Sequence, residues 1–197
     1  MGSFKTSETE LQDLFKAWVA ISVAFAIVLG SGSSMQNLLS VQFVINFLLA
    51  AFTVGLGFLF HEMGHKIVAQ RYGCFAEFRA WDRMLLLAVV MSFLGFVFAA
   101  PGAVMIQGRV DRVRNGRISI AGPGTNIVMA LIFLGLILGF GTNLFFQYGL
   151  MINAWLGLFN MIPIGGLDGG KVLRWNKTAY GLVVVAAVIL LFGMSYI

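Results

Sequence analysis

The chain has 197 residues, of which 59% are hydrophobic and 11% are charged, and its mean hydropathy is +0.92. Soluble domains are about 45–50% apolar and about 25% charged. The composition therefore excludes a soluble enzyme, a disordered chain and a disulfide scaffold. Thirteen Lys and Arg against eight Asp and Glu give a net charge of +5. In so apolar a chain this excess indicates membrane orientation before it indicates nucleic-acid binding, and we expect no nucleic-acid partner.

Long apolar segments predict an all-α polytopic membrane protein, a helical bundle of about five to six spans in a single domain, residues 1–197. A spanning helix needs about 20 mostly apolar residues. The helix that follows the first loop is expected to continue past its apolar part to Gly73, as a C-cap. In chain order, the five predicted spans are residues 14–29, 41–60, 118–140, 144–162 and 178–197.

A sixth apolar stretch, residues 84–106, is interrupted by the sequence Ala-Ala-Pro-Gly and either spans the membrane or re-enters the same side. If it is re-entrant, all thirteen Lys and Arg lie on one side; if it spans, six lie on one side and seven on the other. The positive-inside bias favours the re-entrant path, with the N-terminus cytoplasmic. Residues 103–110 and 117–120 are expected to form short membrane-associated β-strands.

Both histidines of the chain belong to one motif, His61-Glu62-Met63-Gly64-His65. Residues at positions i and i+4 of a helix share a face, so the two imidazoles can bind one zinc ion while Glu62 acts as a general base. Ionisable residues within membrane spans are costly and usually functional, and this motif follows directly on twenty apolar residues. The alternative is that the histidines cap or pair at a helix end.

Catalytic zinc sites use three protein ligands, and the histidines supply two. Cys74 is the single cysteine and lies only nine residues beyond His65. The other carboxylates precede the first span or lie in basic stretches. Asp168 alone stands in an apolar, glycine-rich setting at the end of a span, so elimination predicts it as the third ligand. With residues 84–106 re-entrant, it also reaches the same membrane face as the histidines.

These residues resemble the site-2 protease family of intramembrane zinc metalloproteases. The likeness rests on the H-E-x-x-H motif, on the segment Asn160-Met161-Ile162-Pro163 with Asp168-Gly169, and on an A-G-P segment at residues 121–123. It covers about residues 54–174, and it implies a catalytic core of about residues 41–175. The chain has no stretch long and polar enough for an inserted peptide-binding or nucleotide-sensing domain.

The resemblance implies a zinc endopeptidase that cleaves membrane-anchored proteins in or near their transmembrane segments, as in regulated intramembrane proteolysis. His61, His65 and Asp168 would bind one zinc ion per chain, and Glu62 would assist the attack of water at that zinc. Asn160, and with less support Asn126, would contact the substrate or the transition state. The expected location is the cell membrane, with the active-site opening on the cytoplasmic side.

Two other functions are weighed against the protease. A metal-ion transporter would favour several ligand sets or a repeat, whereas the sequence has one cluster and no repeat. A non-catalytic binder of membrane proteins would be expected to lose Glu62 or a ligand, and all four residues are present. The sequence does not predict an oligomeric state.

Overall fold

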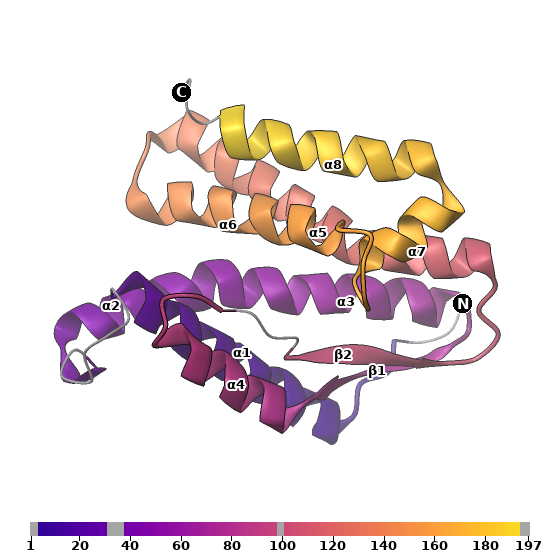
Figure 1. The fold of residues 1–197 in the computed structure, drawn as a ribbon, viewed down its shortest axis with the longest axis horizontal. Helices are drawn as coiled ribbons and strands as arrows, with labels where there is room; N and C mark the ends of the chain where they lie inside the picture. The colour runs from indigo at the N-terminus through magenta and orange to yellow at the C-terminus, as the bar shows by residue number, and fades with distance from the viewer. Residues whose placement is uncertain (1–3, 31–37, 98–100, 194–197) are drawn as a thin grey trace. The chain divides into compact units, whose positions relative to one another are not determined.

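The computed structural model describes residues 4–30, 38–97 and 101–193, and helices dominate it (Figure 1). Two short strands pair with each other in a two-stranded sheet. The elements, in chain order, are α1 (Glu8–Leu29), α2 (Val41–Ala50), the π-helical turn η2 (Ala51–Gly55), α3 (Leu56–Arg71), β1 (Phe75–Ala80), α4 (Asp82–Ser92), β2 (Gly102–Gln107), α5 (Arg112–Phe140), α6 (Leu144–Asn160), α7 (Asp168–Trp175) and α8 (Lys177–Phe192).

Within the described residues, three helices are long and apolar enough to cross a membrane: Glu8–Leu29, Val41–Arg71 and Arg112–Phe140. Helix α8 is apolar but shorter. Together with the composition, these helices make the chain a membrane protein that is mainly helical. The five-span count stays a prediction.

The stretch 84–106 does not form one continuous helix in the part that is described. It contains most of α4 and then β2, which pairs with β1, the strand that precedes α4. The predicted strand at 103–110 is confirmed as β2, although β2 is shorter. Residues 98–100, which include part of the Ala-Ala-Pro-Gly sequence, lie outside the described residues, as do residues 31–37 of the first predicted loop.

The strand predicted at residues 117–120 is wrong, because these residues lie inside α5. The Asp111 side chain accepts a hydrogen bond from the Arg114 backbone N–H and thereby caps a helix that begins at Arg112. A side-chain cap of this kind satisfies an otherwise unpaired amide in the first turn. Once the helix has started, the β-branched residues that follow continue it, since helix propagation costs less than nucleation.

Helix α3 ends as the sequence predicts, close to Gly73. Gly73 has a φ of 76° and its N–H donates to the Gln70 carbonyl, while the Cys74 N–H donates to the Ala69 carbonyl. These two bonds are those of a Schellman motif, in which glycine takes the left-handed position. The helix is therefore stopped by its own C-cap at Arg71, just after the His-Glu motif.

The chain divides into two compact units. The N-terminal unit comprises residues 5–59 and 77–105, and the C-terminal unit comprises residues 60–76 and 106–197 with the first four residues. In the N-terminal unit, the Trp18 indole N–H donates to the Ala51 carbonyl over 3.0 Å at the π-helical turn. A Cβ at Gly55 would lie 2.7 Å from the Trp18 ring, so glycine is needed there for the close approach.

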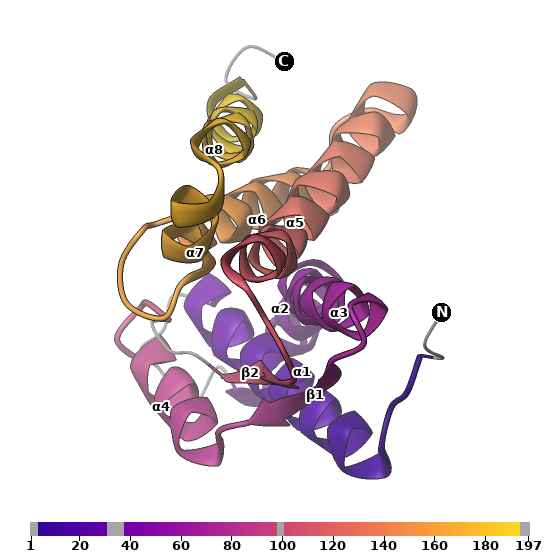
Figure 2. The same ribbon diagram turned by 90° about the vertical axis from the view of Figure 1, so that its right-hand side faces the viewer.

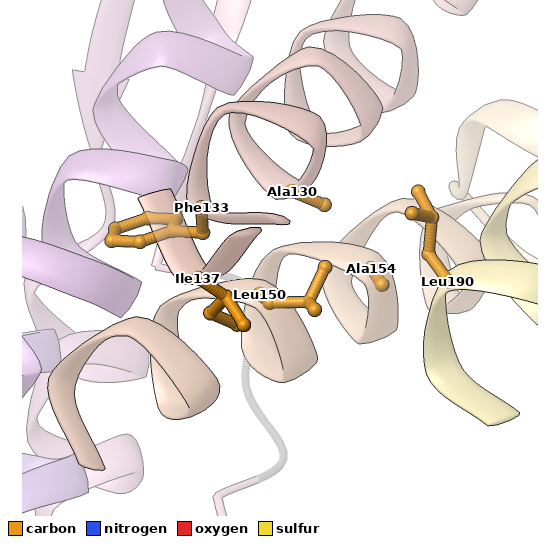
Figure 3. Close-up of a cluster of buried hydrophobic side chains, with 6 residues drawn as sticks. All are labelled: Ala130, Phe133, Ile137, Leu150, Ala154 and Leu190. Atoms are coloured by element: carbon orange, nitrogen blue, oxygen red, sulfur yellow. The ribbon is translucent and has the colours of Figure 1, made fainter. Parts of the chain in front are cut away.

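The core of the C-terminal unit lies where α5, α6 and α8 pack together (Figures 1 and 2). Figure 3 shows the buried side chains that these three helices contribute to the core. This core holds α5 and α6 in place, and both helices carry side chains of the site described below. Its six buried members are Ala130, Phe133, Ile137, Leu150, Ala154 and Leu190.

Candidate metal centre

The two histidines of α3 point their Nε2 atoms at each other. The His65 Nε2 and His61 Nε2 atoms lie 3.0 Å apart. Both rings are buried, with 5% of His61 and 8% of His65 exposed. The helical i, i+4 spacing thus brings the imidazoles together, as the motif predicts.

Asp168 completes a cluster of three ligand-type side chains in the C-terminal unit. Its Oδ2 atom lies 3.1 Å from His65 Nε2 and 3.4 Å from His61 Nε2. Asp168 is the first residue of α7, which begins after the loop that follows α6. Gly169 permits this placement, because a Cβ there would overlap the Met161 backbone and would lie 2.8 Å from the Met161 Cα.

One face of α5 holds both histidines, through Ile118, Gly122 and Asn126, which are spaced four residues apart. The His65 Nδ1 atom lies 2.8 Å from the Ile118 carbonyl oxygen, and the His61 Nδ1 atom lies 2.6 Å from the Asn126 Oδ1. Gly122 lies between these two anchors, and a Cβ there would come within 2.6 Å of His61 Nε2. Helix α5 therefore holds both rings through their Nδ1 atoms. The absence of a side chain at Gly122 leaves space next to their Nε2 atoms.

The hydrogen bonds at Nδ1 determine which ring nitrogen is available to a metal. A carbonyl oxygen accepts but never donates, so His65 Nδ1 must donate to Ile118, and Nε2 carries the lone pair of the neutral ring. The Asn126 oxygen places His61 in the same state. Two Nε2 lone pairs and a carboxylate oxygen then face one another over 3.0–3.4 Å. Three acceptors at this distance repel each other unless a cation lies between them.

The cluster fits zinc. Ligand atoms about 2.0–2.1 Å from a tetrahedral zinc ion lie about 3.3 Å from each other. The three separations here, 3.0, 3.1 and 3.4 Å, are close to that value. Two imidazoles and one carboxylate are also the donor set of many catalytic zinc sites.

The charge state of Asp168 suits a metal ligand. Burial of its carboxyl group opposes ionisation, but His65 and His61, when protonated, outweigh burial and lower the pKa of Asp168. A cation held by neutral imidazoles would act in the same direction. Its second oxygen, Oδ1, lies 3.6 Å from Lys171 Nζ on the same helix. One carboxylate oxygen thus faces the histidines and the other faces a lysine.

The structure brings His61, His65 and Asp168 together, and it buries Glu62 between the histidines on α3 with 8% exposed. Asn126 is fully buried against His61. Asn160 is partly buried, and its side-chain N–H donates to the Leu156 carbonyl of its own helix over 3.0 Å.

Sequence reasoning missed Asn153, whose fully buried side chain on α6 accepts a hydrogen bond from Asn126. The signal for it was present. An amide inside a predicted span needs a buried partner, because no water is available to it there.

Two buried histidines that share α3 with a buried glutamate, together with the Asp168 carboxylate from α7, fit a metal-dependent hydrolase. The chain is 38% identical over 189 residues to a protein of Methanocaldococcus jannaschii with the provisional name zinc metalloprotease MJ0611, and the match covers 93% of each chain. No family model and no solved structure matches the chain.

Two further relatives match over part of their length. Zinc metalloprotease MJ0392 of the same organism is 30% identical over 156 residues, a match that covers 77% of this chain and 39% of that protein. A Mycolicibacterium smegmatis protein provisionally named zinc metalloprotease Rip2 is 32% identical over 133 residues, covering 58% of this chain and 51% of its own. Since the first match extends over nearly the whole of both chains, this chain belongs to the zinc metalloprotease family of these proteins.

Proposed function

We propose that the protein is an intramembrane zinc endopeptidase of the site-2 protease type, which hydrolyses peptide bonds in or near the transmembrane segments of membrane-anchored proteins. One observation carries the proposal. His61 and His65 lie in a 31-residue helical stretch, Val41–Arg71, that is long and apolar enough to cross a membrane. A zinc site on such a helix supports hydrolysis at the bilayer, with membrane-anchored chains as the proposed substrates.

Each residue of the site has a part in the proposed reaction. Zinc, when bound, acidifies water and polarises a peptide carbonyl. His61, His65 and Asp168 would hold it. The Glu62 carboxylate would accept a proton from the attacking water and deliver it to the leaving nitrogen as the C–N bond breaks.

The two asparagines predicted to contact substrate differ in their support. Asn126 is fully buried and bonded to His61, which favours orientation of that ligand over contact with substrate. Asn160 lies at the end of α6, eight residues before Asp168 along the chain. Its contact with substrate or transition state stays a prediction.

We infer that an extended substrate segment adds to the outer edge of β2. A helical substrate must unwind before its carbonyls can be attacked, and strand addition would hold the unwound segment. In the N-terminal unit, the Phe78 N–H of β1 donates to the buried Glu10 carboxylate over 2.9 Å, so this side of β1 is occupied. The β2 strand is the more exposed of the two.

The proposed orientation keeps the N-terminus and the opening of the active site on the cytoplasmic side of the cell membrane. All thirteen Lys and Arg then lie on that side if residues 84–106 are re-entrant. The pairing of β1 with β2 supports this path, because it brings the chain before α4 back together with the chain after it.

Cleavage of a membrane-spanning test protein by purified enzyme tests the proposal. We expect cleavage by the wild type, inhibition by a zinc chelator, and recovery on addition of zinc. Glu62→Gln keeps the size of the side chain but removes the base, and should lower the rate by about 10²–10⁴-fold. Zinc content should stay stoichiometric in this variant, because Glu62 is not a ligand.

The matched control is Glu77→Gln, which changes another buried glutamate, one that pairs with Arg79 on β1. It should leave the cleavage rate within about threefold of the wild type, below any effect expected of a lost general base. A wild-type cleavage rate in Glu62→Gln, or cleavage that continues at the same rate in the presence of the chelator, would contradict the zinc mechanism. Zinc transport into vesicles without cleavage would favour the transporter instead.

A further inference from the structure

We propose that Asn153 of α6 is a positioning residue for the metal, and that it fixes the tautomer of His61 through Asn126. The inference rests on the zinc site of the proposed function but not on the substrate. It concerns a side chain that is linked to His61 by two successive hydrogen bonds, one from Asn153 to Asn126 and one from Asn126 to His61.

A directed chain of hydrogen bonds carries the inference. The Asn153 Nδ2 donates to the Gly149 carbonyl over 2.9 Å. The Asn126 Nδ2 donates to Asn153 Oδ1 over 3.3 Å, and the Asn126 Oδ1 faces His61 Nδ1 over 2.6 Å. The chain therefore links α6 to the first zinc ligand on α3 by way of α5.

The direction of this chain is set at the Gly149 end. A backbone carbonyl can only accept, so it is the Asn153 NH₂ group that faces Gly149, and the Asn153 oxygen must face Asn126. Asn126 is then forced to present its NH₂ group to Asn153 and its oxygen to His61. His61 must donate from Nδ1, which leaves the Nε2 lone pair for the metal.

His65 reaches the same state by a shorter route, since its Nδ1 lies directly against the Ile118 carbonyl at 2.8 Å. Both imidazoles are thus set by a backbone carbonyl, one directly and one through two amides. Asn126 alone would not suffice for His61, because an amide can rotate by 180° and offer either an acceptor or a donor. Asn153 removes that freedom. Both amides are fully buried, so no water can replace either bond from bulk solvent.

Zinc affinity in detergent, measured by competition with a chromophoric chelator and with no substrate present, tests the proposal. Asn153→Leu should weaken zinc binding about 10–100-fold, as loss of an outer partner of a ligating histidine does. It should also change the visible absorption spectrum of the Co²⁺-loaded protein, which reports the geometry of the ligands. Both measurements can give the expected result even if the protein cleaves no peptide. The two proposals can therefore be refuted independently of each other.

Asn153→Ser provides a variant that is expected to fold if Asn153→Leu does not. A serine hydroxyl can bond back to the Gly149 carbonyl, as Ser22 does to Trp18 and Thr125 does to Ala121, each over 2.7 Å. It is too short to reach Asn126, so the same loss of zinc affinity is expected.

Asn46→Leu is the matched control, because Asn46 is another buried asparagine in an apolar helix and accepts a side-chain hydrogen bond from Gln42. It should leave zinc affinity and the Co²⁺ spectrum unchanged. Asn126→Leu provides the second test. When Asn153→Leu is added to Asn126→Leu, zinc affinity should change by no more than about twofold, since the effects of substitutions in one hydrogen-bond network are not additive.

Two results would overturn the inference. One is an Asn153 variant that binds zinc as tightly as Asn46→Leu does. The other is a loss of zinc affinity from Asn153→Leu that is equally large with and without Asn126, which would indicate loosened packing of α6 instead of a relay.

Discussion

Gly122 is the residue at which the structure makes its sharpest prediction. Replacing it with alanine adds one methyl group on the face of α5 that holds both histidines. The new carbon would lie 2.6 Å from His61 Nε2 and 2.5 Å from His65 Cε1. Ordinary contact between such atoms is about 3.5 Å. The change therefore demands a shift of about 1 Å at the rings that carry the ligand atoms.

The neighbours cannot make this shift without loss. Moving α5 away would lengthen the bonds from Ile118 and Asn126 to the two rings, because these residues lie one helical turn on either side of Gly122. Moving the rings would displace Nε2 atoms whose distance to zinc is defined to about 0.2 Å. Overpacking of this kind costs about 1–3 kcal/mol. If the ligand set bears that cost, zinc affinity falls about 5- to 150-fold.

Gly124→Ala is the control, since a Cβ at Gly124 would have no neighbour within 4 Å among the described atoms, and it lies on the same helix. We expect it to bind zinc like the wild type and to be slightly more stable to heat, because alanine favours helix over glycine by about 1 kcal/mol. Competition with a chromophoric chelator measures zinc affinity in both variants. Equal affinities for Gly122→Ala and Gly124→Ala would refute the reasoning.

Three further predictions concern the third ligand, the packing of α3 against α5 and the membrane orientation. Asp168→Ala should lose stoichiometric zinc, whereas Lys171→Met should weaken zinc binding less than about tenfold, because Lys171 faces only the carboxylate oxygen that points away from the histidines. Equal losses of zinc in the two variants would contradict Asp168 as a ligand. Gly64→Ala should lower the free energy of unfolding by about 1–3 kcal/mol, because its Cβ would lie 2.6 Å from the Thr125 hydroxyl and 2.8 Å from the Ala121 carbonyl oxygen of α5. A midpoint of thermal unfolding equal to that of Gly124→Ala would count against this prediction. Single cysteines at Asn115 and Thr142, in a cysteine-free background, should be labelled from opposite sides of the membrane, and labelling from one side would overturn the proposed orientation.

The metal cluster could be predicted from sequence because the chain offers few alternatives. Two histidines at helical spacing and one carboxylate in an apolar setting leave little choice, and the structure brings these three residues together. The end of α3 near Gly73 and the strand β2 were also predictable, since a C-capping glycine and a short apolar stretch after a Pro-Gly pair are local signals.

The support of the cluster could not be predicted in the same way, because it depends on how separate helices meet. The strand expected at residues 117–120 was wrong because β-branched residues there are overruled by a helix that Asp111 starts upstream. As a result Ile118 contributes a helical carbonyl to His65, a contact that no local pattern indicates. Asn153 is similar, since its role depends on the approach of α6 to α5.

Two glycines explain how the motif acquires its geometry. Gly64 stands between the histidines in the sequence, and Gly122 faces their Nε2 atoms from α5; a Cβ at either would clash with the opposite helix. Only when α3 and α5 approach this closely can the Ile118 carbonyl and the Asn126 amide reach the Nδ1 atoms. The His-Glu motif would supply two of the ligands, and α5 would determine which nitrogen of each ring faces the metal. It follows that substitutions at Gly122 and Asn126 should impair zinc binding as severely as changes to the outer partners of any ligand, although α5 contributes no ligand of its own.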